Sequence, residues 1–406
     1  MAQVVLQHVA LSYQLFWDDQ RQLAGVQLRV DPDPLHPLDT AHLLTVLQDV
    51  WGKPKLPLLL STSSDLLRMD LLDQLPAAFA LLEVPDDTLQ HPTLQPRVLR
   101  AHQRRLPMVW RGEPGQGVKA AHAACFTQSI LSLTPEQALA ALRVARRRKP
   151  GLDTGASPVQ AKQIYEGVAS RALANHCLDD QGISALLGWP SEDVLYACRQ
   201  KRIACDQPTI THLINAIDSH MAMDGIEHAL CNDPLLAYRF LRYTNSAALG
   251  LNRDISSLRQ GLMVLGLGRL KTWLTEQLPQ ASVEPNLQPV RRAMVLRAQV
   301  TAELLHTGEN EALRRELFLC GLLSQIDQLM NEPLSSTLSS LPLPARISTA
   351  IVGHSGPYWP YLAIATALEN PHAHTLQDLC TTHEFELEDV NLALLRVLAA
   401  QRCTMA

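Results

Sequence analysis

The sequence predicts a chain of two parts, an α/β half followed by an all-helical half. In the first half, apolar stretches of about five residues alternate with helical patterns of about twelve, which is typical of parallel β/α units. In the second half, Leu and Ala dominate and apolar residues recur at helical spacing. Because 406 residues exceed one typical core, we expect two domains, at residues 1–200 and 201–406.

Composition excludes several classes of protein. Hydrophobic residues make up 47% of the chain and charged residues 18%, as in a globular protein. The net charge of -5 gives no general attraction to nucleic acid or to an anionic membrane. No stretch has the apolar length of a membrane-spanning helix and the first residues lack a basic segment, so we expect a cytoplasmic protein without a membrane partner. The eight cysteines show no CxxC spacing, which favours packed, reduced thiols.

Strands and helices alternate along the first half. Strands are expected at residues 4–15, 25–30, 56–60, 79–84 and 107–110, and helices at 39–51, 64–75, 93–105, 134–149, 160–177 and 191–199. Residues 151–158 are expected to be a flexible connector. Further helices are expected at residues 290–306, 317–329, 341–353, 357–369 and 385–401, after a proline-rich loop at 278–289.

One basic run ends the helix expected at residues 134–149. It contains Arg146, Arg147 and Arg148 in the segment RVARRRK. Cations in a last helical turn interact favourably with the helix dipole, which favours a solvated helix end. The alternative is a basic patch that binds a nucleotide or a partner. Nucleic-acid binding is unlikely, because the run has no interleaved aromatic residues and the chain is acidic overall.

The most strongly patterned stretch is Asn232–Leu274, which predicts three helices. The first begins at Asp233, which can accept a free backbone N–H, and at Pro234, which suits the first helical position. Asn245 and Ser246 fall near its end. Short polar side chains at a helix end can reach loop backbone, so we expect this pair to tie the helix to residues 250–257. The alternative is direct contact with a partner.

The second helix of this stretch has a start and a stop signal. Ser256 or Ser257 can cap its first turn, and Gly266 fits a C-terminal cap with positive φ. Residues 267–274 then form the third helix.

This ordered set resembles the signature of the HDOD domain family. The matching positions are Asp233, Pro234, Leu236, Asn245, Ser246, Ser256, Ser257, Gly261 in the usual small-residue place, Leu265 and Gly266. The resemblance implies a helical fold similar to HD-type phosphohydrolases without their metal ligands, in a bacterial signalling protein. None of the fifteen histidines is followed by Asp, the pair that an active HD hydrolase needs for metal.

The order of strands in the first half resembles an EAL domain, the barrel that hydrolyses cyclic di-GMP, in the family that joins an EAL-like half to an HDOD half. Gln27 stands where that family's signature Glu falls, and Ser61 where a ligating Asn is expected. Glu83 is kept, but Trp110 and Arg111 replace a pair of aspartates. Hard divalent cations need carboxylate oxygens. The resemblance therefore implies an incomplete or degenerate EAL-like barrel without catalytic residues, metal or cofactor.

These observations favour a non-catalytic signalling protein that acts through contacts with other signalling proteins. One alternative is binding of a cyclic dinucleotide or nucleic acid without hydrolysis, although cyclic di-GMP binding is doubtful without the acidic residues. The other is a metal-dependent phosphodiesterase, which would need several converging carboxylates or imidazoles.

Overall fold

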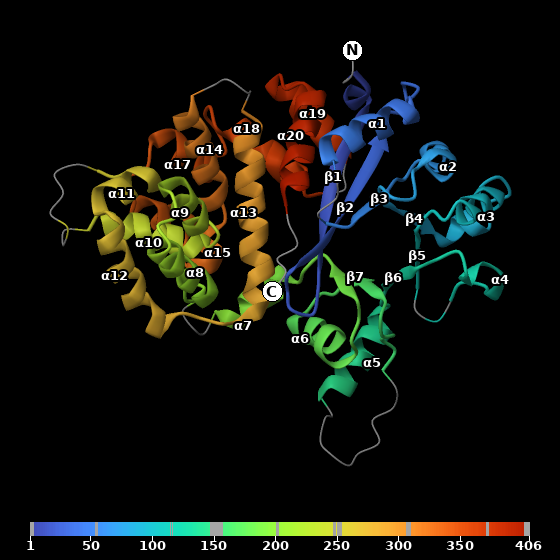
Figure 1. Ribbon diagram of the computed structural model, residues 1–406, viewed down its shortest axis with the longest axis horizontal. Coiled ribbons are helices and arrows are strands. Elements are labelled where there is room, and N and C mark those ends of the chain that lie inside the picture. The colour runs from blue at the N-terminus through green and yellow to red at the C-terminus, as the bar shows by residue number, and fades with distance from the viewer. Residues whose placement is uncertain are drawn as a thin grey trace. The chain divides into compact units, whose positions relative to one another are not determined.

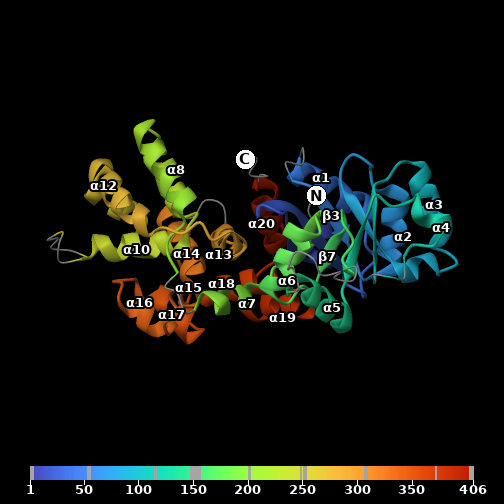
Figure 2. The same ribbon diagram turned by 90° about the horizontal axis from the view of Figure 1, so that it is seen from below.

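The computed structural model describes residues 4–52, 56–113, 115, 117–146, 157–199, 203–246, 249, 254–305, 310–370 and 373–401 (Figures 1 and 2). The chain divides into two compact units. The first contains residues 1–193 and 367–406, and the second contains residues 194–366. This division differs from the predicted one, in which residues 201–406 form a single domain.

The first unit contains a closed barrel of eight strands in sequence order. The strands are β1 (Val9–Trp17), β2 (Leu23–Pro32), β3 (Leu58–Ser61), β4 (Leu81–Pro85), β5 (Met108–Gly112), β6 (Gln128–Ser132), β7 (Ile164–Glu166) and β8 (Ala185–Leu187). β1 runs antiparallel to both β2 and β8, and every other neighbouring pair is parallel. The expectation of an incomplete barrel is therefore wrong. β7 and β8 close it, and β7 lies within residues 160–177, where a helix was predicted.

In the first 110 residues, helices follow the strands as predicted; these are α1 (Thr40–Trp51), α2 (Asp65–Gln74) and α3 (Gln95–Gln103). Further along the same unit lie α4 (Ala120–Ala123), α5 (Pro135–Arg146) and α6 (Arg171–Asn175). The starts of α1 and α2 are fixed by side-chain caps. Asp39 accepts a hydrogen bond from the N–H of His42, and Ser64 accepts one from Leu67.

Two C-terminal helices also belong to the barrel unit, α19 (Ala373–His383) and α20 (Leu387–Ala400). A fully buried carboxamide on α20 holds them there. Asn391 donates to the carbonyl oxygens of Leu6 and Val9, at 2.9 and 2.7 Å, and accepts from the N–H of Leu11 at 3.3 Å. A buried amide with all these partners fixes the position of α20 on β1.

The second unit is all-helical, as predicted. Its helices, with α7 and α18 at its two ends, are α7 (Ser191–Cys198), α8 (Gln207–Asp218), α9 (Met223–Leu230), α10 (Pro234–Thr244), α11 (Leu258–Leu265), α12 (Leu267–Gln277), α13 (Gln288–Glu303), α14 (Glu311–Leu323), α15 (Ile326–Met330), α16 (Leu334–Ser339), α17 (Ala345–Gly353) and α18 (Trp359–Ala367). The helix predicted at residues 317–329 is two helices, α14 and α15. Part of the predicted 278–289 loop forms short 3-10 turns.

Two further observations bear on composition. Among the described helices, none is both long and apolar enough to cross a membrane. Seven cysteines lie in the described ranges, none of these forms a disulfide with another, and six are buried. Burial raises the pKa of the Cys177 and Cys320 thiols to about 12, so these groups stay protonated, as expected of packed thiols.

A buried charge network joins α8, α10 and α13. The guanidinium of Arg291, which is 1% exposed, lies 3.2 Å from an Asp206 oxygen and 3.5 Å from an Asp233 oxygen. It also donates to the carbonyl oxygen of Ala204 at 2.7 Å. Asp206 caps α8 and Asp233 caps α10. Because buried charges are tolerated only when they are paired, this network fixes the starts of two helices against a third.

The network gives a first prediction. Arg291→Leu leaves two buried carboxylates without their cation, and we expect the free energy of unfolding to fall by about 3–5 kcal/mol. Arg269→Gln is the matched control, because this exposed arginine of α12 has no partner among the described residues and its loss should change stability by less than about 0.5 kcal/mol. Urea unfolding of both variants measures the difference. Equal stability of Arg291→Leu and wild type would contradict the role of the network.

Candidate functional site

The inside of the barrel is built in layers. Barrel strands point every second side chain inward. One inward set is an apolar cluster that contains Leu59, Val109, Ile130 and Ile164. Two residues further along the same strands are Ser61, Arg111, Ser132 and Glu166. The alternation therefore places a polar layer directly beyond the apolar layer, toward the carboxyl ends of the parallel strands.

Arg111 joins the carboxylates of this polar layer. Its Nε donates to Glu83 Oε1 at 2.6 Å and its Nη2 donates to Glu83 Oε2 at 3.1 Å. Its Nη1 pairs with Glu166. Gln27 donates its side-chain N–H to Glu83 at 2.6 Å, and Ser132 donates its hydroxyl to Glu166 at 2.5 Å. Both carboxylates are thus supplied with donors from within the barrel.

The charge of Arg111 is stable in this position. Burial by itself lowers the pKa of the guanidinium, but the charges of Glu83 and Glu166 outweigh that effect, so the pKa is raised overall. A divalent cation binds proteins through carboxylate oxygens such as these. Here a permanent side-chain cation pairs with both carboxylates.

Trp110 and Ser61, two other barrel residues named from the sequence, take no part in the ion pairs of Arg111. Trp110 faces the opposite way from Arg111. It belongs to a cluster with Leu131 and Tyr165 and donates its indole N–H to Asp86 at 3.2 Å. Because neighbouring strand residues face opposite sides, only Arg111 of the two residues that replace the expected aspartates belongs to the polar layer. Ser61 is 4% exposed, and its hydroxyl has no hydrogen-bond partner.

Glu166 and Ser132 are site residues that the sequence did not reveal. They lie at the ends of β7 and β6, neither of which was predicted. β7 has three residues, too few for a period-two pattern to be seen. The sequence did contain one weak signal for this strand, the triplet IYE at residues 164–166. In a strand, its apolar Ile164 and its acidic Glu166 would face the same side.

One surface cluster has side chains that could ligate a metal ion. Among the described residues, the ligand atoms of His8, Asp33 and His36 lie within 4.8 Å of one another. Asp33 contacts His36 Nδ1 at 2.7 Å and accepts from the N–H of Leu35 at 2.9 Å. These two hydrogen bonds, the backbone one first, lower the pKa of Asp33. The two imidazole rings stack at 4.5 Å.

In the second unit, the signature residues form the start and end of α10. Asp233 is fully buried, accepts from the N–H of Leu235 at 3.0 Å and precedes Pro234 at the first helical position, as predicted. It also accepts from the N–H of Asp206 at 2.7 Å, which explains why an acid and not an apolar residue stands here.

Asn245 and Ser246 have different surroundings. The Asn245 carboxamide accepts from the N–H of Ile255 at 2.8 Å and donates to the carbonyl oxygens of Ile255 and Leu241 at 2.8 and 2.7 Å. It ties the end of α10 to the approach to α11, as predicted. The Ser246 hydroxyl is buried and makes no hydrogen bond. For Ser246 the predicted tie is absent among the described residues.

The remaining signature residues shape α11. Ser257 is its N-cap and accepts from the N–H of Gln260 at 3.2 Å, while Ser256 precedes it. Gly266 ends the helix with φ of 74°, as predicted for a residue that needs positive φ. Gly261 lies against Phe240, where an added Cβ would come within 2.8 Å of the ring. A small residue is therefore needed where α10 and α11 cross.

The basic run can be followed only in part. Arg146 is exposed at the last turn of α5. Arg147 and Arg148 lie outside the described residues, so the basic patch stays a prediction.

Comparison with known proteins agrees with these two parts. Residues 207–338 match the HDOD domain family, so this part of the second unit is an HDOD domain. It is 25% identical over 170 residues to cyclic di-GMP phosphodiesterase CdgJ of Vibrio cholerae, covering 42% of this chain and 39% of that one. It is 25% identical over 150 residues to the uncharacterized protein YuxH of Bacillus subtilis, covering 36% of each.

The matched regions span less than two fifths of the length of these curated relatives. Among solved structures, the MmoQ response regulator of Methylococcus capsulatus aligns with a TM-score of 0.39 and 15% identity, over 47% of this chain and 97% of its own.

The signature pair gives a second prediction. Asn245→Ala removes three hydrogen bonds and leaves the Ile255 backbone groups unpaired, so we expect a loss on the order of 1–3 kcal/mol in the free energy of unfolding and a lower melting temperature. Ser246→Ala is the matched control on the neighbouring residue. Its hydroxyl has no partner, so its melting temperature should stay the same or rise. Equal destabilisation by both variants, measured by thermal unfolding, would contradict this division of roles.

Proposed function

We propose that the chain is a non-catalytic bacterial signalling protein that acts through contacts of its EAL-like barrel and HDOD unit with other signalling proteins. The single observation that carries this proposal is the position of Arg111, whose guanidinium pairs with both Glu83 and Glu166. Metal-assisted hydrolysis needs a cation that polarises the phosphate and activates water. A guanidinium has no vacant coordination position for a water molecule, so it cannot lower the pKa of a bound water as a metal ion does.

Gln27 supports the same proposal. Its amide donates to Glu83, so it uses one carboxylate oxygen and supplies no negative charge of its own. The polar layer therefore carries two carboxylates against one fixed cation. A two-metal phosphodiesterase needs several more anionic ligands at this place.

The activity in the name of CdgJ defines the alternative, hydrolysis of cyclic di-GMP. Binding of a cyclic dinucleotide without hydrolysis is a second alternative. For the proposed protein contacts, the exposed face of α11 offers Met263 and Val264, which are 62% and 44% exposed. Adjacent exposed apolar side chains within the signature stretch suit contact with a partner.

The third prediction tests catalysis. We expect no turnover of cyclic di-GMP by the purified full chain with Mg²⁺ or Mn²⁺, because Arg111 holds both carboxylates. Gln27→Glu alone should not create activity, since it leaves Arg111 in place. Product formation is followed by chromatography, with an active cyclic di-GMP phosphodiesterase as positive control. Turnover by the wild-type chain that survives repurification and disappears in Glu83→Gln would refute the proposal.

The fourth prediction tests whether Arg111 takes the place of a metal ion. The double variant Gln27→Glu, Arg111→Asp has four carboxylates where wild type has two and a guanidinium, so we expect it to bind Mn²⁺ saturably. The chain with wild-type Gln27 and Arg111 should not bind Mn²⁺ saturably. Both proteins also carry His36→Ala, which removes the surface cluster as a source of binding. The electron paramagnetic resonance signal of free Mn²⁺ measures the difference. Equal Mn²⁺ binding by both proteins would show that Arg111 does not block a metal site.

A further inference from the structure

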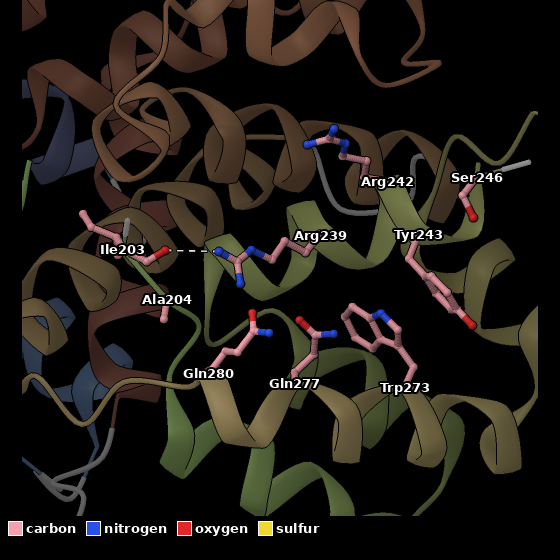
Figure 3. A pocket seen from close by; sticks show the side chains of 9 residues that line it. All are labelled: Ile203, Ala204, Arg239, Arg242, Tyr243, Ser246, Trp273, Gln277 and Gln280. Atoms are coloured by element: carbon pink, nitrogen blue, oxygen red, sulfur yellow. Dashed lines mark hydrogen bonds between the residues drawn. The ribbon is translucent and has the colours of Figure 1, made fainter. Parts of the chain in front are cut away.

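The second unit contains a cavity of about 560 Å³ between α10 and α12. It is lined by Ile203, Ala204, Arg239, Arg242, Tyr243, Ser246, Trp273, Gln277 and Gln280. Figure 3 shows Trp273, Gln277 and Gln280 rising from one side toward Arg239 and Tyr243 on the other. The volume lies within the range of roughly 300–1,000 Å³ that is typical of small-molecule sites.

Among the described residues, the lining carries positive charge and no carboxylate. Arg239 and Arg242 contribute two guanidiniums. Among the described residues, neither arginine forms an ion pair. Arg239 donates one N–H to the carbonyl oxygen of Ile203 at 3.1 Å, which holds its side chain at the cavity wall and leaves other donors of the guanidinium available. An unpaired pair of guanidiniums in a concave site attracts a multiply charged oxyanion.

The aromatic lining adds a second feature. The rings of Tyr243 and Trp273 stack at 5.4 Å with 18° between their planes. Trp273 also meets Phe240 edge to face at 5.8 Å, which fixes the indole in place. Both rings line the cavity, and Figure 3 shows Trp273 between Tyr243 and Gln277, so the stacked pair forms one aromatic wall. A planar ring can stack there, and the carboxamides of Gln277 and Gln280 can pair with donors and acceptors on its edge.

We propose that this cavity binds a mononucleotide, with its phosphate on the Arg239 and Arg242 side and its base against Tyr243. The chemistry that selects this class is the combination of two unpaired guanidiniums, a stacked aromatic wall and two carboxamides in one cavity. No residue of the barrel takes part. The proposal goes beyond the function proposed above and does not depend on it, so the binding assay below and the hydrolysis assay can fail separately.

The test is equilibrium dialysis of the full chain against AMP or GMP, each alone and then with increasing concentrations of inorganic phosphate. We expect saturable binding of AMP or GMP at one site per chain, and competition by inorganic phosphate only at concentrations at least about tenfold higher, because the base adds stacking. Saturation by neither nucleotide would overturn the proposal. Phosphate that competes as well as the nucleotide would overturn the assignment of the base to Tyr243.

Variants locate the site. Arg239→Gln removes a charge-assisted contact with phosphate and should weaken nucleotide binding about tenfold to a hundredfold. Arg242 is exposed and unpaired, so Arg242→Gln should keep the fold and weaken binding about two- to fivefold. Trp273→Phe keeps a buried ring but changes the stack, and should also weaken binding.

Arg269→Gln is the matched control, because it removes the same charge from an exposed position of α12 outside the cavity. It should bind the nucleotide as wild type does. A loss of affinity in Arg269→Gln equal to that in Arg239→Gln would show unspecific attraction and overturn the proposal. Wild-type affinity in both Arg239→Gln and Arg242→Gln, with melting temperatures unchanged, would do the same.

Discussion

A guanidinium held between two carboxylates organises each of the two units. In the barrel, Arg111 lies between Glu83 and Glu166, and in the helical unit Arg291 lies between Asp206 and Asp233. A buried charge is costly unless it is paired, so each arginine forces the elements that carry its partners into one arrangement. In the barrel these elements are β4, β5 and β7. In the helical unit they are the starts of α8 and α10 and the first turn of α13.

The charge network around Arg291 also helps to hold one wall of the cavity in place. Arg291 donates to the carbonyl oxygen of Ala204, and Arg239 donates to that of Ile203. The short segment before α8 is thereby held from two sides, and its residues 203 and 204 form one wall of the cavity. A wall fixed by buried hydrogen bonds needs little ordering when a ligand binds, so more of the contact energy remains as affinity. The contacts of Arg291 therefore both stabilise the helical unit and hold the wall of the cavity in place.

Local signals in the sequence predicted local structure well. Asp233, Pro234 and Gly266 each impose a backbone geometry on their own position, so α10 and the end of α11 could be placed from residue type alone. The failures are long-range. β7 and β8 are held by neighbours far away in the sequence, and Asn391 bonds to backbone more than 380 positions earlier. The polar layer was therefore only half visible, with Glu83 and Arg111 recognised and Glu166 missed.

The neighbouring residues Asn245 and Ser246 show that membership of one sequence signature does not imply one structural role. Every hydrogen-bonding group of the Asn245 side chain that points at the loop is used, so its presence is explained by the structure alone. The Ser246 hydroxyl is buried and makes no hydrogen bond with the described residues. Burial of an unpaired hydroxyl costs free energy, so the contacts of this side chain do not explain the serine. A pattern read from sequence marks both positions alike, and only the hydrogen bonds of the folded chain distinguish them.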